Sequence, residues 1–564
     1  MENKEYMLID GNPVEINGEK NLLEVIRKAG IELPTFCYHS ELSVYGACRM
    51  CMVENSHGGM EAACSTVPKA GMEIYTNTER LHKHRKMILE LLLANHCRDC
   101  TTCQKNGKCR LQELASLFGL ESIRFKNLKP EPELDTSSLS IIRDAHKCIL
   151  CGDCVRMCNE IQNVGAIDFV NRGSKMVIGP AFNEPIANSP CVGCGQCAAV
   201  CPTGAIVIRK DTGRVWPELN DKNTKVVAQV APAVRVAMAK EFGLPENENS
   251  MGRITAALRR LGFDEVYDTA TGADLTVLEE SNEFLQRIEA GENLPLITSC
   301  CPAWIQYCEK NHPELMKNIS TCKSPMQMFS SVIKAEYANS SRRVVCVAVM
   351  PCTAKKFECA REEFMHDGVP ETDYVITTQE LIQMIHKAGI VFDELEPEAV
   401  DSVFSTCTGA GVIFGVTGGV TEAVLRRLST DKSKKALLSI AFNDVRSMKG
   451  VKETTIPYGD KEVRIAIVSG LKNAESVIQA LKNGEHFDFI EVMACPGGCV
   501  AGGGQPFGTN ATKEVRGKAL YSADKMLSIK RSEENPLMLS LYDGVLKGRV
   551  HELLHVHYNH KEEE

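Results

Sequence analysis

The chain has 564 residues, 26 of them cysteine, and a formal net charge of −9. At about 150 residues per domain it should form about four domains, and with 44% hydrophobic residues it can build cores, which excludes a small disulfide scaffold. The acidic balance argues against nucleic acid as the main partner, and no apolar run approaches the ~20 residues of a membrane helix. The opening MENKEYMLIDG lacks the apolar stretch of a secretory signal. We therefore expect a cytoplasmic protein whose reduced cysteines bind metals or clusters.

The first cysteine block follows a strand-like run at 6–11 and a helix-like stretch at 21–30. Its spacing is C-x10-C-x2-C-x12-C, formed by Cys37, Cys48, Cys51 and Cys64. Four thiolates in a small β-rich domain can hold a [2Fe–2S] cluster, although the spacing differs from the plant-type pattern. It resembles the N-terminal domain of the large iron–sulfur subunit of respiratory complex I. Zinc is the alternative metal for these thiolates, but the cysteines of four-cysteine zinc sites usually lie in two closely spaced pairs, which this spacing does not show.

The second block, NHCRDCTTCQKNGKC, offers one histidine and four cysteines. It reads H-x3-C-x2-C-x5-C over His96, Cys100, Cys103 and Cys109, with Cys97 as an extra thiol. By itself this set suits zinc and a [4Fe–4S] cluster almost equally. Its place directly after the first block matches the complex I subunit and favours a His-ligated [4Fe–4S] cluster. An exchange of Cys97 for His96 as the ligand stays open.

Two further blocks repeat the spacing C-x2-C-x2-C-x3-C. The repeat is typical of bacterial two-cluster ferredoxins, in which the fourth cysteine of each run ligates the other cluster. It predicts one [4Fe–4S] cluster on Cys148, Cys151, Cys154 and Cys201. It predicts a second one on Cys158, Cys191, Cys194 and Cys197. Residues 126–140, before these blocks, lack apolar periodicity and are predicted to be a linker.

After residue 211 the pattern changes to alternating strands and helices. Short β-branched runs are found at 225–232, 342–351, 463–470 and 487–496, with helical stretches such as 252–263 and 421–429 between them. This alternation favours parallel sheets, in which ligands collect at the carboxyl ends of strands. Three segments bring cysteines to such places: TSCCPAW (298–304), MPCTAKKFE (350–358) and EVMACPGGCVAGGGQP (491–506). Each alone could be a buried cysteine or a turn, but together they offer thiols for one more [4Fe–4S] cluster.

These three segments match the signatures of iron-only, [FeFe] hydrogenases, and the resemblance covers essentially the whole chain. The accessory blocks come in the order found in clostridial ferredoxin-linked enzymes, and VHELLHVHY resembles the C-terminal segment of the family. The resemblance implies an α/β catalytic domain, with two lobes of mostly parallel sheets, and small α+β ferredoxin-like iron–sulfur domains. The predicted domains are 1–80 ([2Fe–2S]), 81–125 (His/Cys3), 126–140 (linker), 141–210 (two [4Fe–4S] clusters) and 211–564 (catalytic domain with a small-subunit-like segment).

The resemblance implies the reaction 2H⁺ + 2e⁻ ⇌ H₂, with ferredoxin as the electron partner and protons and H₂ as substrates. It implies an H-cluster, which is a [4Fe–4S] cubane linked to a diiron subcluster with carbonyl, cyanide and a dithiolate bridge, in addition to three accessory [4Fe–4S] clusters and one [2Fe–2S] cluster. Maturation proteins build the diiron part in this family. The implied cubane ligands are Cys301, Cys352, Cys495 and Cys499, the last also bridging to the diiron unit.

The pocket around this cofactor is also implied by the resemblance. Lys355 is expected to donate to a cyanide, and the Gly-rich stretch 502–504 to let the backbone approach the cofactor. The expected pocket wall comprises Met350, Met493, Phe414, Pro232, Ala233, Met326 and Glu358. Met326 stands where family members often have a glutamine, and Ala233 stands where some have a serine. At both positions an apolar side chain replaces a hydrogen-bonding group.

A proton relay is implied from Cys300, beside Cys301, through Glu280, Ser320, Glu283 and Arg287. The two glutamates and the arginine are spaced i, i+3 and i+7 and so share one helical face. Without the resemblance, such a row is more often a solvated set of ion pairs. Five other cysteines, at 308, 322, 346, 359 and 407, are expected to be buried small hydrophobes.

Residues 80–110 carry eight cationic side chains against two acidic ones. This bias favours a docking patch for an acidic ferredoxin, with a solvated helix face as the alternative. Three other functions stay open. A subunit of an NADH-linked bifurcating hydrogenase is compatible, although no flavin or nucleotide fingerprint and no extra C-terminal cluster block is found. A hydrogen sensor would commonly carry a signalling domain and alter the relay cysteine, and a Narf-like iron–sulfur assembly protein would lack the full ligand and relay set.

Overall fold

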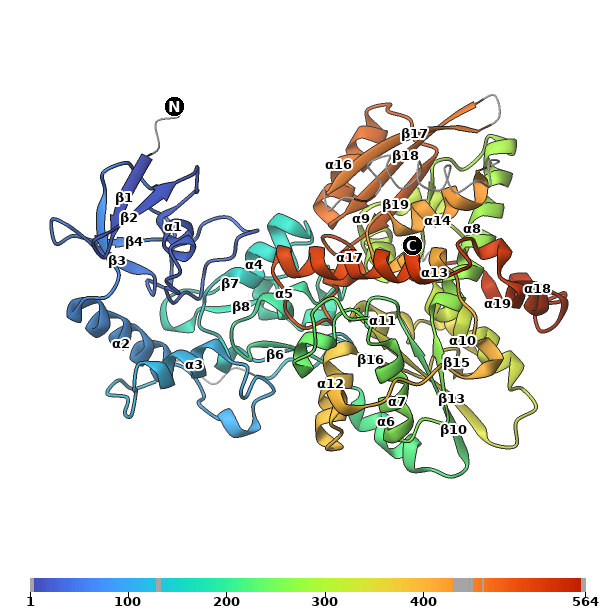
Figure 1. The fold of residues 1–564 in the computed structure, drawn as a ribbon, viewed down its shortest axis with the longest axis horizontal. Helices are drawn as coiled ribbons and strands as arrows, with labels where there is room; N and C mark the ends of the chain where they lie inside the picture. Colours follow the sequence, from blue (N-terminus) through green and yellow to red (C-terminus); the bar gives the residue numbers. More distant parts are fainter. Residues whose placement is uncertain (1–4, 128–132, 430–445, 447–449, 459–460, 559–564) are drawn as a thin grey trace.

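The computed structural model describes residues 5–127, 133–429, 446, 450–458 and 461–558. Figure 1 shows the N-terminal strands and the helices that follow them, up to residue 117, at one end of the long axis, residues 141–208 in the middle and the α/β part at the other end. Of the predicted linker 126–140, residues 128–132 lie outside the described residues. Within the described ranges, no helix combines the length and the apolar character needed to cross a membrane.

The first module is a five-stranded sheet covered by helix α1. The strand order is β2-β1-β5-β3-β4, with β1 and β5 parallel and the other neighbours antiparallel. Asn21 caps α1 by accepting a hydrogen bond from the N–H of Glu24 (3.1 Å), and the helix buries its apolar face against the sheet. The elements are β1 (Glu5–Ile9), β2 (Asn12–Ile16), α1 (Leu22–Lys28), β3 (Met52–Asn55), β4 (Met60–Ala62) and β5 (Glu73–Tyr75).

The second cysteine block lies between helices α2 (Glu79–Ala94) and α3 (Arg110–Leu117). The third and fourth blocks lie in a module of two small antiparallel sheets and two short helices. Gly152 and Gly195 precede these helices with φ of 77° and 70°, each directly after a cysteine, so both runs turn sharply and gather their thiols. The elements are β6 (Ile141–Arg143), α4 (Asp153–Arg156), β7 (Asp168–Val170), β8 (Val177–Gly179), α5 (Gln196–Val200) and β9 (Ile206–Ile208).

The α/β part contains two four-stranded sheets. The first, β11-β10-β13-β16, is parallel throughout. In the second, β12-β19-β18-β17, strand β17 is antiparallel to its neighbour and the others are parallel. The four predicted β-branched runs form β10, β13, β18 and β19. The strands are β10 (Thr224–Val230), β11 (Glu265–Asp268), β12 (Leu296–Ile297), β13 (Arg343–Met350), β16 (Tyr374–Thr377), β17 (Val451–Tyr458), β18 (Lys461–Ser469) and β19 (Phe489–Met493).

Helices cover both faces of the first sheet, because alternate side chains of its strands point to opposite sides. Val226 packs into a core with α7 and α12, whereas Val227 packs into a second core with α8 and α10. Helix α8 also places Phe284 and Ile288 against the second sheet, so its middle lies between the two sheets. The helices are α6 (Thr212–Asn220), α7 (Met251–Leu261), α8 (Ala270–Ala290), α9 (Pro302–Asn311), α10 (Pro325–Glu336), α11 (Ala354–Glu358), α12 (Thr378–Lys387), α13 (Gly409–Val412), α14 (Gly419–Leu428) and α16 (Leu471–Lys482).

The C-terminal part returns over the α/β part through α17 (Asn510–Met526), α18 (Pro536–Asp543) and α19 (Val550–Leu554) (Figure 1). Directly after α19 the chain pairs with residues 321–323. The N–H of Val556 donates to the carbonyl of Thr321 (2.7 Å), and the N–H of Lys323 donates to that of Leu554 (2.8 Å). This segment therefore covers the loop that precedes α10.

Candidate functional site

Strand ends from both sheets meet at one cavity. Strands β10 and β13 lead into it from the first sheet, and β12 and β19 lead into it from the second. All four predicted cubane ligands line it together: Cys301, Cys352, Cys495 and Cys499. Cys300 and Lys355 line it too, as do six of the predicted wall residues: Pro232, Ala233, Met326, Met350, Phe414 and Met493.

Glu358, the seventh predicted wall residue, does not line this cavity. Its buried carboxylate lies behind Lys355 and accepts a hydrogen bond from Lys355 Nζ (2.7 Å), which also donates to the carbonyl of Cys300 (3.3 Å). Burial alone would lower the pKa of Lys355, because it disfavours the ammonium charge. The charge and hydrogen bond of Glu358, together with Cys352 and Cys300, outweigh burial, so the pKa of Lys355 is raised. Glu358 therefore positions a permanent cation instead of forming the wall.

The donor set fits an anionic iron–sulfur cofactor. Burial raises the pKa of all four thiols, that of Cys352 to about 11. Thiolates would therefore persist here only when iron compensates their charge. The N–H of Ala494 donates to Cys301 Sγ (3.4 Å), a hydrogen bond that stabilises charge on sulfur. Lys355 adds a positive charge at the edge of an otherwise largely apolar wall, to which Met326 and Ala233 contribute.

The glycines at 502–504 also serve the packing of the protein backbone itself. A Cβ on Gly503 would lie 2.4 Å from the carbonyl oxygen of Cys194, and one on Gly502 or Gly504 would lie 2.2 or 2.9 Å from that of Pro351. These contacts are with protein backbone, and Gly502 also lines the cavity. The glycines therefore let this loop pack against the end of β13 and against the fourth cysteine block.

The predicted relay residues on α8 are not a solvated row. Glu280 is fully buried, and the side chains of Glu283 and Arg287 are each 11% exposed. Arg287 donates to Glu283 Oε1 (2.5 Å), and the hydroxyl of Ser320 donates to Glu283 Oε2 (2.7 Å). The structure thus joins three of the five predicted relay residues by hydrogen bonds.

Glu280 and Cys300 form the inner part of this group. Among the described residues, neither carboxylate oxygen of Glu280 has a hydrogen-bond partner. Burial, with the nearby charge of Glu283, raises the pKa of Glu280 to about 8, so this carboxyl is mostly neutral at pH 7. Burial raises the pKa of the Cys300 thiol, and Glu280 is the next largest cause. Glu280 and Cys300 are therefore electrostatic neighbours.

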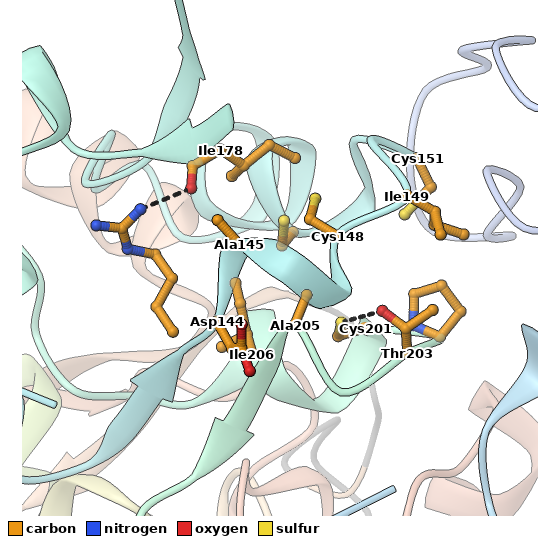
Figure 2. Close-up of a pocket in the computed structure, with 13 residues that line it drawn as sticks. Asp144, Ala145, Cys148, Ile149, Cys151, Ile178, Cys201, Thr203, Ala205 and Ile206 are labelled. Atoms are coloured by element: carbon orange, nitrogen blue, oxygen red, sulfur yellow. Dashed lines mark hydrogen bonds between the residues drawn. The ribbon is translucent and has the colours of Figure 1, made fainter. Parts of the chain in front are cut away.

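Two smaller cavities collect the third and fourth cysteine blocks in a crossed arrangement. One is lined by Cys148, Cys151, Cys154 and Cys201. The other is lined by Cys158, Cys191, Cys194 and Cys197. Figure 2 shows Cys148, Cys151 and Cys201 around the first cavity, with the Thr203 hydroxyl 3.8 Å from Cys201 Sγ. Each cavity thus takes three thiols from one run and the fourth from the other.

The cysteines of each of the two N-terminal blocks also lie close together. The N–H of Cys48 donates to Cys37 Sγ (3.4 Å), and hydrogen bonds from Cys37 and Cys64 lower the pKa of Cys48 and Cys51 to about 7. Both His96 and Cys97 line a cavity with Cys100, Cys103 and Cys109. Every cysteine lies in the described part and is free, and in that part no three His, Cys, Asp or Glu side chains are placed to hold a single ion.

Contacts between modules arrange these sites in sequence. Arg156 of α4 donates to the carbonyl of Cys37 (2.9 Å), and a Cβ on Gly204 would lie 2.7 Å from Cys103 Sγ. Both N-terminal sites therefore adjoin the two-cluster module. On the other side of this module, Thr353 Oγ1 donates to the carbonyl of Gly193 (2.7 Å), next to Cys194. The fourth block thus adjoins the large cavity.

Gln196 is a site residue that sequence reasoning did not identify. It lies between Cys194 and Cys197, and its buried amide donates to Cys495 Sγ (3.2 Å) and to the carbonyl of Ala501 (2.9 Å). Its position inside a cysteine run was the only signal, because the partner sulfur is 299 residues away in sequence. The amide connects the fourth block directly to a predicted cubane ligand.

Replacing Gln196 by leucine should lower the reduction potential of a cubane bound at Cys495. Hydrogen bonds to ligand sulfur stabilise the more negative, reduced cluster, and the leucine would remove one of them. The measurement is a potentiometric titration followed by electron paramagnetic resonance, with Gln379→Leu as a control away from the thiols. An unchanged potential in Gln196→Leu would contradict this role.

Most of the cationic side chains at 80–110 pair with groups of the same chain. Arg85 is 4% exposed and donates to backbone carbonyls, including that of Met52 (2.8 Å). Three other cations form ion pairs, which are Arg80–Glu54 (3.1 Å), Lys83–Glu79 (2.6 Å) and Lys108–Glu241 (2.7 Å). The charge count of the sequence therefore overstates the positive field of this surface, and the ferredoxin patch loses much of its support.

Family models match five successive parts of the chain. The large cavity lies mainly within residues 224–503, which match "Iron only hydrogenase large subunit, C-terminal domain". Residues 510–561 match "Iron hydrogenase small subunit". The cysteine-rich modules match a 2Fe-2S iron–sulfur cluster binding domain (6–79), the NADH-ubiquinone oxidoreductase-G iron–sulfur binding region (85–124) and a 4Fe-4S dicluster domain (147–209).

Similar proteins agree with these matches. The chain is 41% identical to the NADP-reducing hydrogenase subunit HndD of Solidesulfovibrio fructosivorans, covering 98% of both chains. It is 34% identical to iron hydrogenase 1 of Clostridium pasteurianum, covering 98% of this chain and 99% of that one. An [FeFe]-hydrogenase structure from Chlamydomonas reinhardtii has a TM-score of 0.54 and 36% identity, covering 62% of this chain and 98% of the other. The chain therefore belongs to the iron-only, [FeFe] hydrogenases, a family of oxidoreductases that act on hydrogen.

Proposed function

We propose that this protein catalyses the reversible reduction of protons to hydrogen, 2H⁺ + 2e⁻ ⇌ H₂, in the cavity where the two sheets meet. The observation that carries the proposal is the arrangement of four predicted ligand cysteines, Cys300 and Lys355 around one buried space. Cys301, Cys352, Cys495 and Cys499 would hold the H-cluster, and Lys355 would donate to its anionic part. When bound, this group supplies the making and breaking of the H–H bond.

The proposed proton route uses side chains of the chain itself. Arg287 and Glu283 form its outer, slightly exposed end, and Ser320 donates to Glu283. Glu280 is mostly protonated at pH 7, because its pKa is about 8, and so has a proton to give to Cys300 at the cavity. Glu280 is fully buried, which keeps bulk water away from its carboxyl, and Cys300 faces the cavity.

The proposed ligands of the accessory clusters are the side chains that the structure brings together in each module. One [2Fe–2S] cluster would bind Cys37, Cys48, Cys51 and Cys64. One [4Fe–4S] cluster would bind Cys100, Cys103 and Cys109 with His96. The two cubane sites of residues 141–210 would bind the crossed sets described above. Because the modules touch in order, from Cys37 through Arg156 and from Gln196 to Cys495, the chain would lead electrons from the N-terminal part to the catalytic cavity.

The test is hydrogen production by the full chain, after maturation proteins have built its diiron subcluster, with reduced methyl viologen as the donor. A small dye reports the catalytic reaction independently of the natural partner. Hydrogen formation and uptake at turnover rates support the proposal. Absence of both reactions from protein that contains all its clusters would refute it.

The natural electron partner is a separate part of this proposal. Ferredoxin is the partner implied by the sequence, but the neutralised surface at 80–110 and the 41% identity to a subunit of an NADP-reducing hydrogenase favour a second candidate. In that case the chain would be the catalytic subunit of a nucleotide-linked assembly in the cytoplasm. Purification from its source distinguishes the two: additional subunits and NADPH-dependent hydrogen formation support the assembly, and full activity of the isolated chain with reduced ferredoxin supports the first candidate.

A further inference from the structure

Cys322 was expected to be a small hydrophobe, and it is fully buried, but its surroundings are polar. Its Sγ lies 3.9 Å from Glu283 Oε2, which is also the acceptor of the Ser320 hydroxyl. Its N–H donates to Ser320 Oγ (3.2 Å), and its carbonyl accepts from the hydroxyl of Ser299 (2.6 Å). The thiol is thus held beside Ser320 on the same carboxylate.

Charged groups of two elements face this thiol. Helix α8 contributes Glu279, Glu280 and Glu283, with Arg287 on the far side of Glu283. The C-terminal segment contributes His555, whose Nε2 is 3.1 Å from Glu279 Oε2. Burial raises the pKa of Cys322 well above its ordinary value, and the charges of Glu280 and Glu283 are the next causes. Cys322 is therefore a neutral thiol that contacts Glu283 and has Glu280 as its strongest charged influence.

Ser320 has limited capacity as the sole link between these glutamates. A serine hydroxyl has one proton and two acceptor positions. Its proton is directed at Glu283, and one acceptor position is taken by the N–H of Cys322. The Ser320 hydroxyl and the backbone of Ser299 lie near the buried Glu280 carboxylate and lower its pKa, but neither makes a well-formed hydrogen bond to it within the described part of the chain. A second proton-bearing group between the two glutamates would serve this carboxylate.

We propose that Cys322 is a second proton carrier between Glu283 and Glu280, parallel to Ser320. For inward transfer, protonated Glu283 gives its proton to the sulfur of Cys322 while the thiol proton passes to the carboxylate of Glu280. One S–H bond forms as the other breaks, so Cys322 ends as a neutral thiol, and no electrons are exchanged. The inference rests on the proposed function, because it adds a branch to the proposed proton route.

The test compares turnover in the fully matured protein for Ser320→Ala, Cys322→Ala and the double variant. Cys346→Ala is the control, since it removes another buried thiol from the same hydrophobic core. Fluxes through parallel carriers add. If Ser320 carries about nine tenths of the flux and Cys322 about one tenth, Ser320→Ala should lose about tenfold and Cys322→Ala only about one tenth of turnover. The double variant should lose about a thousandfold, within the range for losing a positioned proton-transfer group. Cys322→Ser retains an exchangeable proton and should restore turnover in the Ser320→Ala background relative to the double variant.

Two further readouts separate a carrier from a structural residue. The solvent deuterium isotope effect on turnover should increase in the variants that lack Ser320 or Cys322 but not in Cys346→Ala. The infrared bands of the metal-bound carbonyl and cyanide should stay unchanged in all of them. The proposal is overturned if Ser320→Ala alone loses as much as the double variant, or if Ser320→Ala with Cys322→Ser is as inactive as the double variant. If wild type and Cys346→Ala are themselves inactive with all clusters present, the proposed function fails, which is a different result from failure of the branch.

Discussion

Cys300→Ala is expected to lower hydrogen turnover by about 10²–10⁴-fold, the contribution of a positioned proton-transfer group. The Cys300 thiol lines the cavity and has Glu280 as its main charged neighbour. Alanine would leave the four predicted cubane ligands and Lys355 in place but remove the last proton carrier before the cofactor. Turnover with reduced methyl viologen, together with iron content and infrared spectra, measures this effect.

The control for this variant is Cys308→Ala. Cys308 is a buried thiol of α9 whose Sγ contacts the carbonyl of His312 (3.4 Å) and which does not line the cavity. It should retain turnover close to that of wild type. Near-normal turnover of Cys300→Ala, with intact clusters, would show that the proposed route is wrong at its innermost residue.

Gly503→Val is expected to reduce turnover by about 10²-fold, the effect of misplacing a site by about 1 Å from a distance. Because a Cβ at 503 would lie 2.4 Å from the carbonyl oxygen of Cys194, the loop with Cys499 must move away from the fourth cysteine block. The same movement would weaken the hydrogen bond from Gln196 to Cys495. The measurement is turnover together with the reduction rate of the catalytic cubane after rapid mixing with a donor.

Gly213→Val is the matched control for this loop variant. A Cβ at Gly213, in α6, would meet nothing within 4 Å, so the same change of residue should leave electron delivery unaffected. If the catalytic cubane were reduced as fast in Gly503→Val as in Gly213→Val, close packing between the loop at 502–504 and the fourth cysteine block would not be what couples their two cluster sites.

Local sequence patterns were sufficient for much of the fold and for the grouping of thiols. The β-branched runs gave β10, β13, β18 and β19, because buried parallel strands need continuous apolar sequence. The repeated cysteine spacing gave the crossed sets, since its turns depend on local glycines such as Gly152 and Gly195.

Features that depend on contacts between distant segments could not be predicted in this way. Glu358 follows Lys355 by three residues, and only the fold shows that it lies behind the lysine and not in the cavity wall. The role of Gly503 depends on Cys194, more than 300 residues earlier, and that of Gln196 depends on Cys495. Cys322 looked inert because nothing in its neighbouring sequence shows that α8 brings carboxylates to it.

The central claim is that the cavity between the two sheets holds an H-cluster on Cys301, Cys352, Cys495 and Cys499. The most direct measurement is infrared spectroscopy of the full chain after complete maturation. We expect bands of metal-bound carbonyl and cyanide that disappear in Cys499→Ala, in which the proposed bridging ligand is missing. Absence of such bands from protein that contains its accessory clusters would show that the cavity does not hold an H-cluster.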